Sequence, residues 1–118
     1  VKHFKFTPKI DRSGKRRIHA RPSAGEIDIC RFWLSQEIAI VRPKLIVALG
    51  ATAARATTGR GAQITARRGN MEATPVGTPV FLTIHPSAIL RSRGDRAAEE
   101  LAFQEDLRSA VAQLAAAA

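Results

Sequence analysis

Two short and largely apolar runs constrain the fold most. They are residues 45–49, which Gly50 follows, and residues 80–84, which His85 follows. A strand without alternation of polar and apolar residues is typical of a parallel sheet that is covered on both faces. Helix signals flank both runs, and strands that alternate with helices indicate an α/β domain. The 118 residues are enough for one such domain with a modest core.

The helix signals differ in strength. Pro22-Ser23-x-x-Glu26 is a capping box, apolar residues follow at helical spacing, and Pro43 ends the predicted helix. A short helix is expected over residues 51–57 with Thr52 as its cap, and a long helix over residues 95–115. The apolar side of the long helix is expected to consist of Leu101, Leu107, Val111 and Leu114.

The remaining segments are read from alternation and from turn residues. Residues 1–6 alternate as a short strand does, and residues 64–68 are predicted to form a polar edge strand. Residues 7–22 carry Pro, Gly, Asp and Ser at the density of a loop. The terminal alanines, residues 115–118, are expected to fray.

Positive charge is concentrated near the start of the sequence. Residues 2–21 hold eight of the nineteen Lys and Arg residues and only Asp11 of the ten acidic residues. Such a run is suited to nucleic acid, because each neutralised phosphate releases condensed counterions. A disordered solubilising arm is the alternative. Because strand and helix signals bracket the run, we interpret it as a basic loop, residues 7–22, that contacts nucleic acid.

Cysteine usage and hydropathy exclude other classes. A single cysteine, Cys30, excludes an internal disulfide, and no apolar run approaches the roughly 18 residues that cross a bilayer. No signal peptide is visible, so we expect a reducing, cytoplasmic location. Because the sequence starts at Val1 inside a strand-like run, we expect it to belong to a longer protein.

His85-Pro86-Ser87 stands at a favourable place for a ligand. In open α/β sheets the binding crevice lies beyond the carboxyl ends of the strands, where His85 is expected. Ser87 could cap the next turn and offer its hydroxyl to a phosphate. Taken alone, the tripeptide is more typical of a turn histidine bonded to a backbone carbonyl.

Five separated segments, in order, resemble the carboxyl-terminal half of UdgX-type proteins, a branch of the iron–sulfur uracil-DNA glycosylase superfamily related to families 4 and 5. They are residues 1–6, 14–19, 30–31, 49–54 and 85–91. The resemblance extends to about residue 108, and its Lys-Arg-Arg-Ile-His segment is particular to this branch. It implies that residues 1–118 are the carboxyl-terminal part of one three-layer α/β/α domain with a central parallel sheet. The first strand and helix would lie outside this chain, which would expose an apolar edge and face.

The resemblance also implies an activity, which is cleavage of the N-glycosidic bond of uracil in single-stranded DNA. His85 would donate a hydrogen bond to a uracil carbonyl, and His19 would attack the sugar carbon and join the protein to DNA. A solvated loop residue is the alternative for His19. The DNA contacts would come from Lys15, Arg16, Arg17, Ser87 and Arg91.

A [4Fe-4S] cluster is the cofactor that the resemblance implies. Cys30 would be a thiolate ligand and His3 an imidazole in place of a family cysteine. The other two cluster cysteines, and the Gly-Glu-Gln-Pro-Gly motif of the uracil pocket, lie near the family's amino terminus and are not in this sequence. The residues alone favour a buried helix-face Cys30 and a strand His3.

The leading hypothesis is therefore the carboxyl-terminal half of a UdgX-like uracil-DNA glycosylase. The alternative is a non-catalytic single-stranded nucleic-acid-binding module derived from the same fold. A basic protein of the ribosomal type fits less well, because residues 22–118 are nearly balanced in charge and contain two apolar strands.

Overall fold

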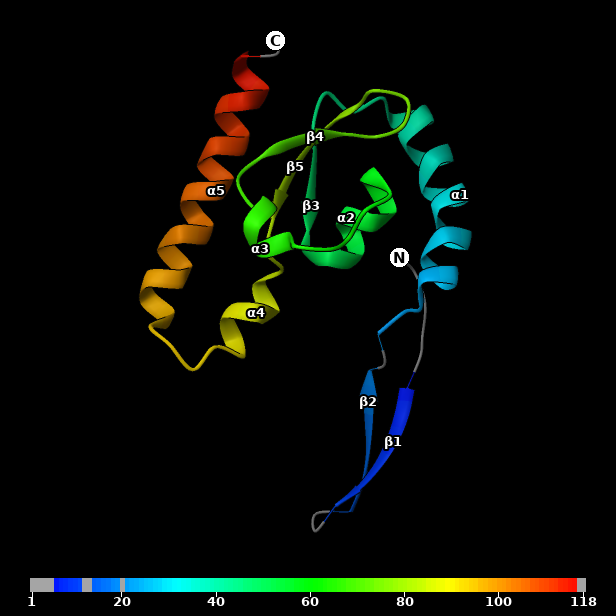
Figure 1. The fold of residues 1–118 in the computed structure, drawn as a ribbon, viewed down its shortest axis with the longest axis vertical. Helices are drawn as coiled ribbons and strands as arrows, with labels where there is room; N and C mark the ends of the chain where they lie inside the picture. The colour runs from blue at the N-terminus through cyan, green and yellow to red at the C-terminus, as the bar shows by residue number, and fades with distance from the viewer. Residues whose placement is uncertain (1–5, 12–13, 20, 117–118) are drawn as a thin grey trace.

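A computed structural model describes residues 6–11, 14–19 and 21–116 of the chain (Figure 1). Its strands and helices follow one another in the order β1 (Phe6–Asp11), β2 (Gly14–His19), α1 (Ala24–Val41), β3 (Ile46–Leu49), α2 (Gly50–Thr58), α3 (Ile64–Arg67), β4 (Met71–Ala73), β5 (Pro79–Thr83), α4 (Pro86–Leu90) and α5 (Arg96–Ala116).

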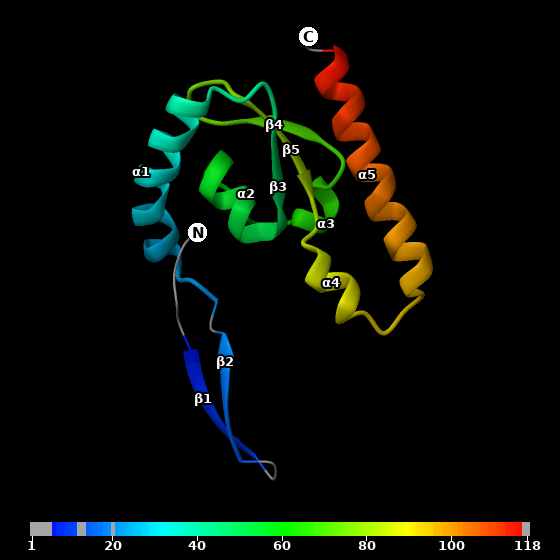
Figure 2. The same ribbon diagram turned by 180° about the vertical axis from the view of Figure 1, so that it is seen from behind.

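A three-stranded sheet forms the centre of the molecule, in the order β3-β5-β4. β3 and β5 run parallel, with Ile46 opposite Val80, while β4 pairs antiparallel with β5. Figures 1 and 2 show α5 on one side of the sheet and α1 and α2 on the other. The predicted α/β class with helices on both sides of a sheet is confirmed. The sheet is mixed, because only a tight turn joins β4 to β5 and such a turn makes neighbouring strands antiparallel.

The core is small and lies where α2 covers the sheet. Its buried members are Ala48 from β3, Ala54 from α2, and Val80 and Leu82 from β5. Val47 of β3 is exposed, so cover on both faces of this strand, as the run 45–49 predicts, is not found among the described residues. Among the described residues, β3 therefore keeps one apolar side chain open to solvent.

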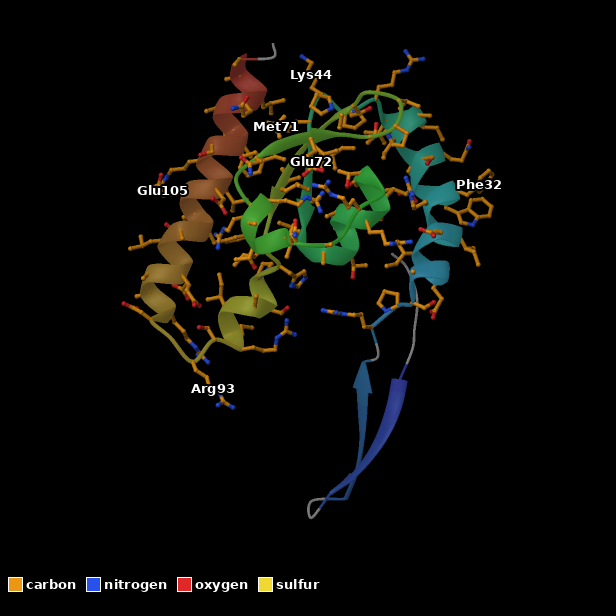
Figure 3. All side chains as sticks on the ribbon, in the orientation of Figure 1. Phe32, Lys44, Met71, Glu72, Arg93 and Glu105 are labelled. Atoms are coloured by element: carbon orange, nitrogen blue, oxygen red, sulfur yellow. The ribbon has the colours of Figure 1, made fainter. Side chains whose placement is uncertain are left out.

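The capping box of α1 is confirmed. The backbone N–H of Glu26 donates to Ser23 Oγ at 3.2 Å, and the N–H of Ser23 donates to Glu26 Oε1 at 3.3 Å. The helix ends at Arg42, which adopts a left-handed conformation before Pro43. Several large apolar side chains are exposed on it, and Phe32 points away from the molecule (Figure 3), in edge-to-face contact with the exposed Trp33.

The predicted edge strand over residues 64–68 is wrong, because this segment forms the one-turn helix α3. Gln63 takes a left-handed conformation that starts the turn, and the turn directs Arg67 inward. Arg67 Nη1 donates to the carbonyls of Arg60 and Ala62, both at 2.8 Å. The short strand β4, residues 71–73, instead lies at an edge of the sheet. The cap predicted at Thr52 is wrong too, since α2 already begins at Gly50 and its N-cap, Leu49, makes no side-chain bond.

Arg67 also pairs with Glu72 of β4. Nε donates to Oε2 at 2.7 Å and Nη2 donates to Oε1 at 2.6 Å. The hydrogen bond from Arg67 lowers the pKa of Glu72 below its usual value, and the same bond raises the pKa of Arg67. This pair fastens the 59–63 loop and α3 to the edge of the sheet, close to the centre of the molecule (Figure 3).

The basic segment 7–22 is not a single loop. Most of it forms a two-stranded antiparallel hairpin of β1 and β2, with Lys9 opposite Arg16 and Phe6 opposite His19. The loop was predicted partly because of Pro8, but an edge strand tolerates a proline. Of the strand expected over residues 1–6, residues 1–5 lie outside the described residues, and Phe6 begins β1.

The long helix α5 presents an unexpected face to the sheet. Leu101, Leu107, Val111 and Leu114, predicted to form its packed side, are all exposed. Ala110 is buried, and Glu99, Phe103 and Asp106 are partly buried. The helix continues through Ala116, and residues 117–118 lie outside the described part. Among the described residues, no helix combines the length and the apolar character needed to span a membrane.

Candidate active site

Two chain turns meet where the parallel strands end. Gly50 follows β3 and His85 follows β5. Gly50 has a positive φ of 88°, and a Cβ at this position would lie 3.1 Å from Cβ of His85. Glycine is therefore required here both for the backbone conformation and for the close approach. The absence of a side chain at Gly50 therefore lets His85 lie close to the end of β3.

The side chain of His85 caps α4. The backbone N–H of Ser87 donates to His85 Nδ1 at 3.0 Å, and Ser87 Oγ lies 2.9 Å from the same nitrogen. A backbone amide can only donate, so Nδ1 must be the unprotonated nitrogen. The neutral ring then carries its proton on Nε2. His85 is exposed and thus presents an N–H donor beyond the strand ends.

This arrangement corrects two details of the sequence interpretation. The cap of α4 is His85 rather than Ser87. The ring accepts from a backbone amide, whereas a turn histidine was expected to bond a carbonyl. Ser87 is partly buried, and Arg91 is exposed at the carboxyl end of α4, where its N–H donates to the Ser87 carbonyl at 3.1 Å.

A polar network that the sequence did not reveal lies beneath His85. Thr83, fully buried at the end of β5, donates its hydroxyl to Asp106 Oδ2 at 2.7 Å. Arg68 donates to the same oxygen from Nε at 3.0 Å and from Nη2 at 2.8 Å. In the sequence, the sign of this network is the polar Thr83 inside an otherwise apolar run.

The basic hairpin extends from the same end of the molecule. Figures 1 and 2 both show it beyond the edge at which β3 and β5 end, with the carboxyl end of β2 nearer the body. His19 is the last residue of β2 rather than a loop residue, and Lys15, Arg16 and Arg17 precede it on the same strand. The structure therefore brings the strand that carries His19 and the turn that carries His85 to one end of the fold.

A cavity of about 390 Å³ lies elsewhere. It opens between α1 and the turn that joins β4 to β5, and Ile38, Arg42 and Val76 are among its lining residues. Both views place this turn at the opposite end of the sheet from α4. The cavity is therefore not part of the site at His85.

The proposed cluster ligands are not brought together by the described residues. Cys30 is partly buried on α1, and His3 lies outside the described part. Within residues 6–11, 14–19 and 21–116, no group of three or more His, Cys, Asp and Glu side chains could hold a metal ion. A four-ligand cluster needs more than one thiol, so this part of the chain does not form an iron–sulfur site on its own.

Comparison with known proteins agrees with this fold. Residues 1–108 match the Uracil DNA glycosylase superfamily, so the chain belongs to that superfamily. It is 38% identical over 93 residues to the type-5 uracil-DNA glycosylase of Pyrobaculum aerophilum, a match that covers 78% of this chain and 40% of the relative. It is 40% identical over 75 residues to the type-4 uracil-DNA glycosylase of Thermotoga maritima, covering 63% and 39%. The chain thus spans about two fifths of the length of these relatives.

Proposed function

We propose that this chain is the carboxyl-terminal part of a UdgX-type uracil-DNA glycosylase, a DNA repair enzyme that recognises uracil in DNA and cleaves its N-glycosidic bond. Membership of the superfamily supports the substrate class. The observation that carries the proposal is the bond from the Ser87 N–H to His85 Nδ1, because it leaves Nε2–H available as a donor. The rest of the domain, including the uracil pocket, would come from chain outside these residues.

His85 would stabilise the leaving group. A glycosylase extrudes the uridine from the base stack and then breaks the bond between C1′ of the sugar and N1 of uracil. The electron pair of that bond stays with the base, and negative charge develops on its carbonyl oxygens. A donor whose orientation is already fixed stabilises this charge without reorganisation, which is the advantage of the tautomer that Ser87 imposes.

His19 would be the nucleophile. The lone pair of a neutral imidazole nitrogen attacks C1′ as the bond to uracil breaks, and a new C–N bond joins protein and DNA. The alkylated ring then loses its remaining N–H proton to water, and the departing uracil anion takes up a proton from water. Two supports for this role are the resemblance of residues 14–19 to the UdgX-type segment and the position of β2 at the same end as His85.

The hairpin would hold the DNA backbone. Lys15, Arg16 and Arg17 are consecutive on β2, and cations at this density favour the phosphates of a single strand. Ser87 and Arg91, on either end of α4, would contact the phosphates that flank the extruded nucleotide. The proposed partner is therefore uracil-containing, single-stranded DNA.

In the complete protein, Cys30 and His3 would be two of the four ligands of a [4Fe-4S] cluster, with the other two outside this chain. The supports are the partial burial of Cys30 and the resemblance of both positions to cluster ligands. We expect Cys30→Ala to remove the iron and the brown absorbance, and His3→Ala to weaken both. A His3→Ala protein with full iron content would remove His3 from the ligand set.

A cytoplasmic location stays a prediction that cell fractionation would test.

Substitution of His19 and substitution of His85 should impair the reaction in different ways. We expect the complete protein, incubated with uracil-containing single-stranded DNA, to give a band shifted by one protein mass on a denaturing gel. His19→Ala should lose this band and still release some uracil, because water can attack in its place. His85→Ala should slow both adduct formation and base release by about 10²- to 10³-fold, the cost of losing one such donor.

Two controls give the experiment its specificity. Thymine-only DNA should yield no adduct, and Arg108→Gln, on the outer side of α5, should behave as the wild type. A denaturation-resistant adduct with His19→Ala, or an equal adduct with thymine-only DNA, would overturn the proposal. A wild type that binds the strand and neither links to it nor releases uracil would instead be the non-catalytic binding module.

A further inference from the structure

The inner face of α5 is polar at two points that are two turns apart. Glu99 and Asp106 are separated by seven residues, so they lie on the same side of the helix about 10 Å apart along its axis. The apolar residues of this helix are mostly exposed, and Ala110 is its buried residue. α5 is therefore attached to its neighbours largely by hydrogen bonds.

Asp106 holds the chain on the amino-terminal side of His85. Its Oδ2 accepts the Thr83 hydroxyl at 2.7 Å, and the two bonds from Arg68 complete the coordination of that oxygen. The side chain of Asp106 is only 18% exposed, so water competes weakly for these bonds. Charge-assisted hydrogen bonds of this kind are among the stronger ones in proteins.

Glu99 and Arg96 hold the chain on the carboxyl-terminal side of His85. Ser92 Oγ donates to Glu99 Oε1 at 2.7 Å, and Arg96 Nη2 donates to the carbonyl of Leu90 at 2.8 Å. Residues 83 and 90–92 are thus both fastened to one helix. The turn with His85, and α4 after it, spans the distance between these two attachments (Figure 2).

We propose that α5 positions the His85 turn and that Asp106, acting through Thr83, is a positioning residue for His85. This inference rests on the proposed function, in which His85 must meet the leaving base at a set distance. Thr83 lies two residues before His85 and opposite Leu49, which precedes Gly50. Release of Thr83 would therefore loosen the contact between Gly50 and His85 together with the turn that fixes the imidazole tautomer.

The test combines a spectroscopic and a kinetic measurement on the complete protein. Thr83→Val removes the hydroxyl at constant shape, Asp106→Asn removes the charge, and Thr83→Ser keeps the hydroxyl. Asp28→Asn is the matched control, because it breaks another Asp–Arg pair, with Arg55, away from β5. Nitrogen-15 NMR reports which ring nitrogen of His85 is protonated, and single-turnover assays report uracil release separately from DNA binding.

We expect the wild type, Thr83→Ser and Asp28→Asn to show one His85 tautomer, protonated on Nε2. Thr83→Val and Asp106→Asn should show exchange between tautomers and a rate of uracil release lower by about 10- to 100-fold, the usual effect of a misplaced reacting group. Binding of uracil-containing DNA should be unchanged. The double variant should lose little more than the worse single variant, because both changes break one network.

The inference is overturned if folded Thr83→Val and Asp106→Asn keep both the wild-type ring spectrum and the wild-type rate. If Asp106→Asn does not fold, Ser92→Ala tests the second attachment, at the bond to Glu99, by the same two measurements. Tautomer exchange in the variants of a protein whose wild type releases no uracil would support the positioning role and refute the proposed function.

Discussion

Glu72→Gln is the substitution whose effect on stability the structure defines best. The Glu72 carboxylate receives two hydrogen bonds from the guanidinium of Arg67, which is itself only 6% exposed. Glutamine keeps the shape and one acceptor oxygen but removes the charge. The variant would leave a buried guanidinium without a counter-ion, a situation that proteins rarely tolerate.

The size of the effect follows from burial. Removal of one partner of a fully buried ion pair costs about 3–5 kcal/mol in the free energy of unfolding. The Glu72 side chain is 26% exposed, and the remaining acceptor of glutamine preserves one of the two bonds. We therefore expect a loss of about 2–3 kcal/mol, just below that range. The pair Arg108–Glu105 is the control, because both side chains are 66% exposed and Glu105→Gln should cost less than about 1 kcal/mol.

The loss should depend on pH in a defined direction. Because Arg67 lowers the pKa of Glu72 below the ordinary 4.5, the pair stabilises the fold fully above about pH 4.5. Its contribution disappears as the pH falls through the lower pKa of the folded state. The difference between the wild type and Glu72→Gln should therefore be constant near neutral pH and shrink in acid.

Urea unfolding of the complete protein, followed by circular dichroism at several pH values, measures this difference. The reasoning is refuted if Glu72→Gln is no more destabilising than Glu105→Gln. It is also refuted if the difference from the wild type stays constant down to about pH 3.

Three further outcomes are expected. Replacing the three hairpin cations of β2 with alanine should flatten the slope of log affinity for single-stranded DNA against log salt by roughly 2, at about 0.7 per phosphate contact. Removal of Arg42, Lys44 and Arg108 should leave the slope unchanged. Gly50→Ala should slow uracil release while DNA binding persists, because its Cβ would press on His85 at 3.1 Å, and an unchanged rate would contradict the contact. Residues 1–118 alone should self-associate on size-exclusion chromatography, since Trp33, Ile40 and Val47 are exposed, and a monomer that melts cooperatively would disprove this.

Local signals predicted those elements whose ends are set by the chain itself. The capping box at Ser23 and the stop at Pro43 placed α1, and the apolar runs placed β3 and β5. The position of His85 after a strand followed from the same reasoning. In each case a short stretch of sequence contains both the signal and the groups that satisfy it.

Elements that depend on distant partners were not predictable in this way. α3 directs Arg67 inward to pair with Glu72 on β4, and no local sequence pattern predicts that pairing. The inner face of α5 was misjudged because Asp106 is held there by hydrogen bonds from Thr83 and Arg68, 23 and 38 residues away. The tautomer of His85 likewise required the observed bond to the Ser87 amide.

The central position of β5 in the sheet has a consequence for how the molecule opens. β5 is bonded along both edges, by β3 and β4, whereas within the described part of the chain each hairpin strand pairs only with the other. Local unfolding free energies follow such differences, so amide protons of β5 should exchange with solvent slowest and those of the hairpin fastest. The hairpin could then open and close around a nucleic-acid strand many times without disturbing β5, the strand that precedes the His85 turn. The proposed nucleophile, His19, would thus belong to a short-lived part of the fold and the proposed donor, His85, to a long-lived one.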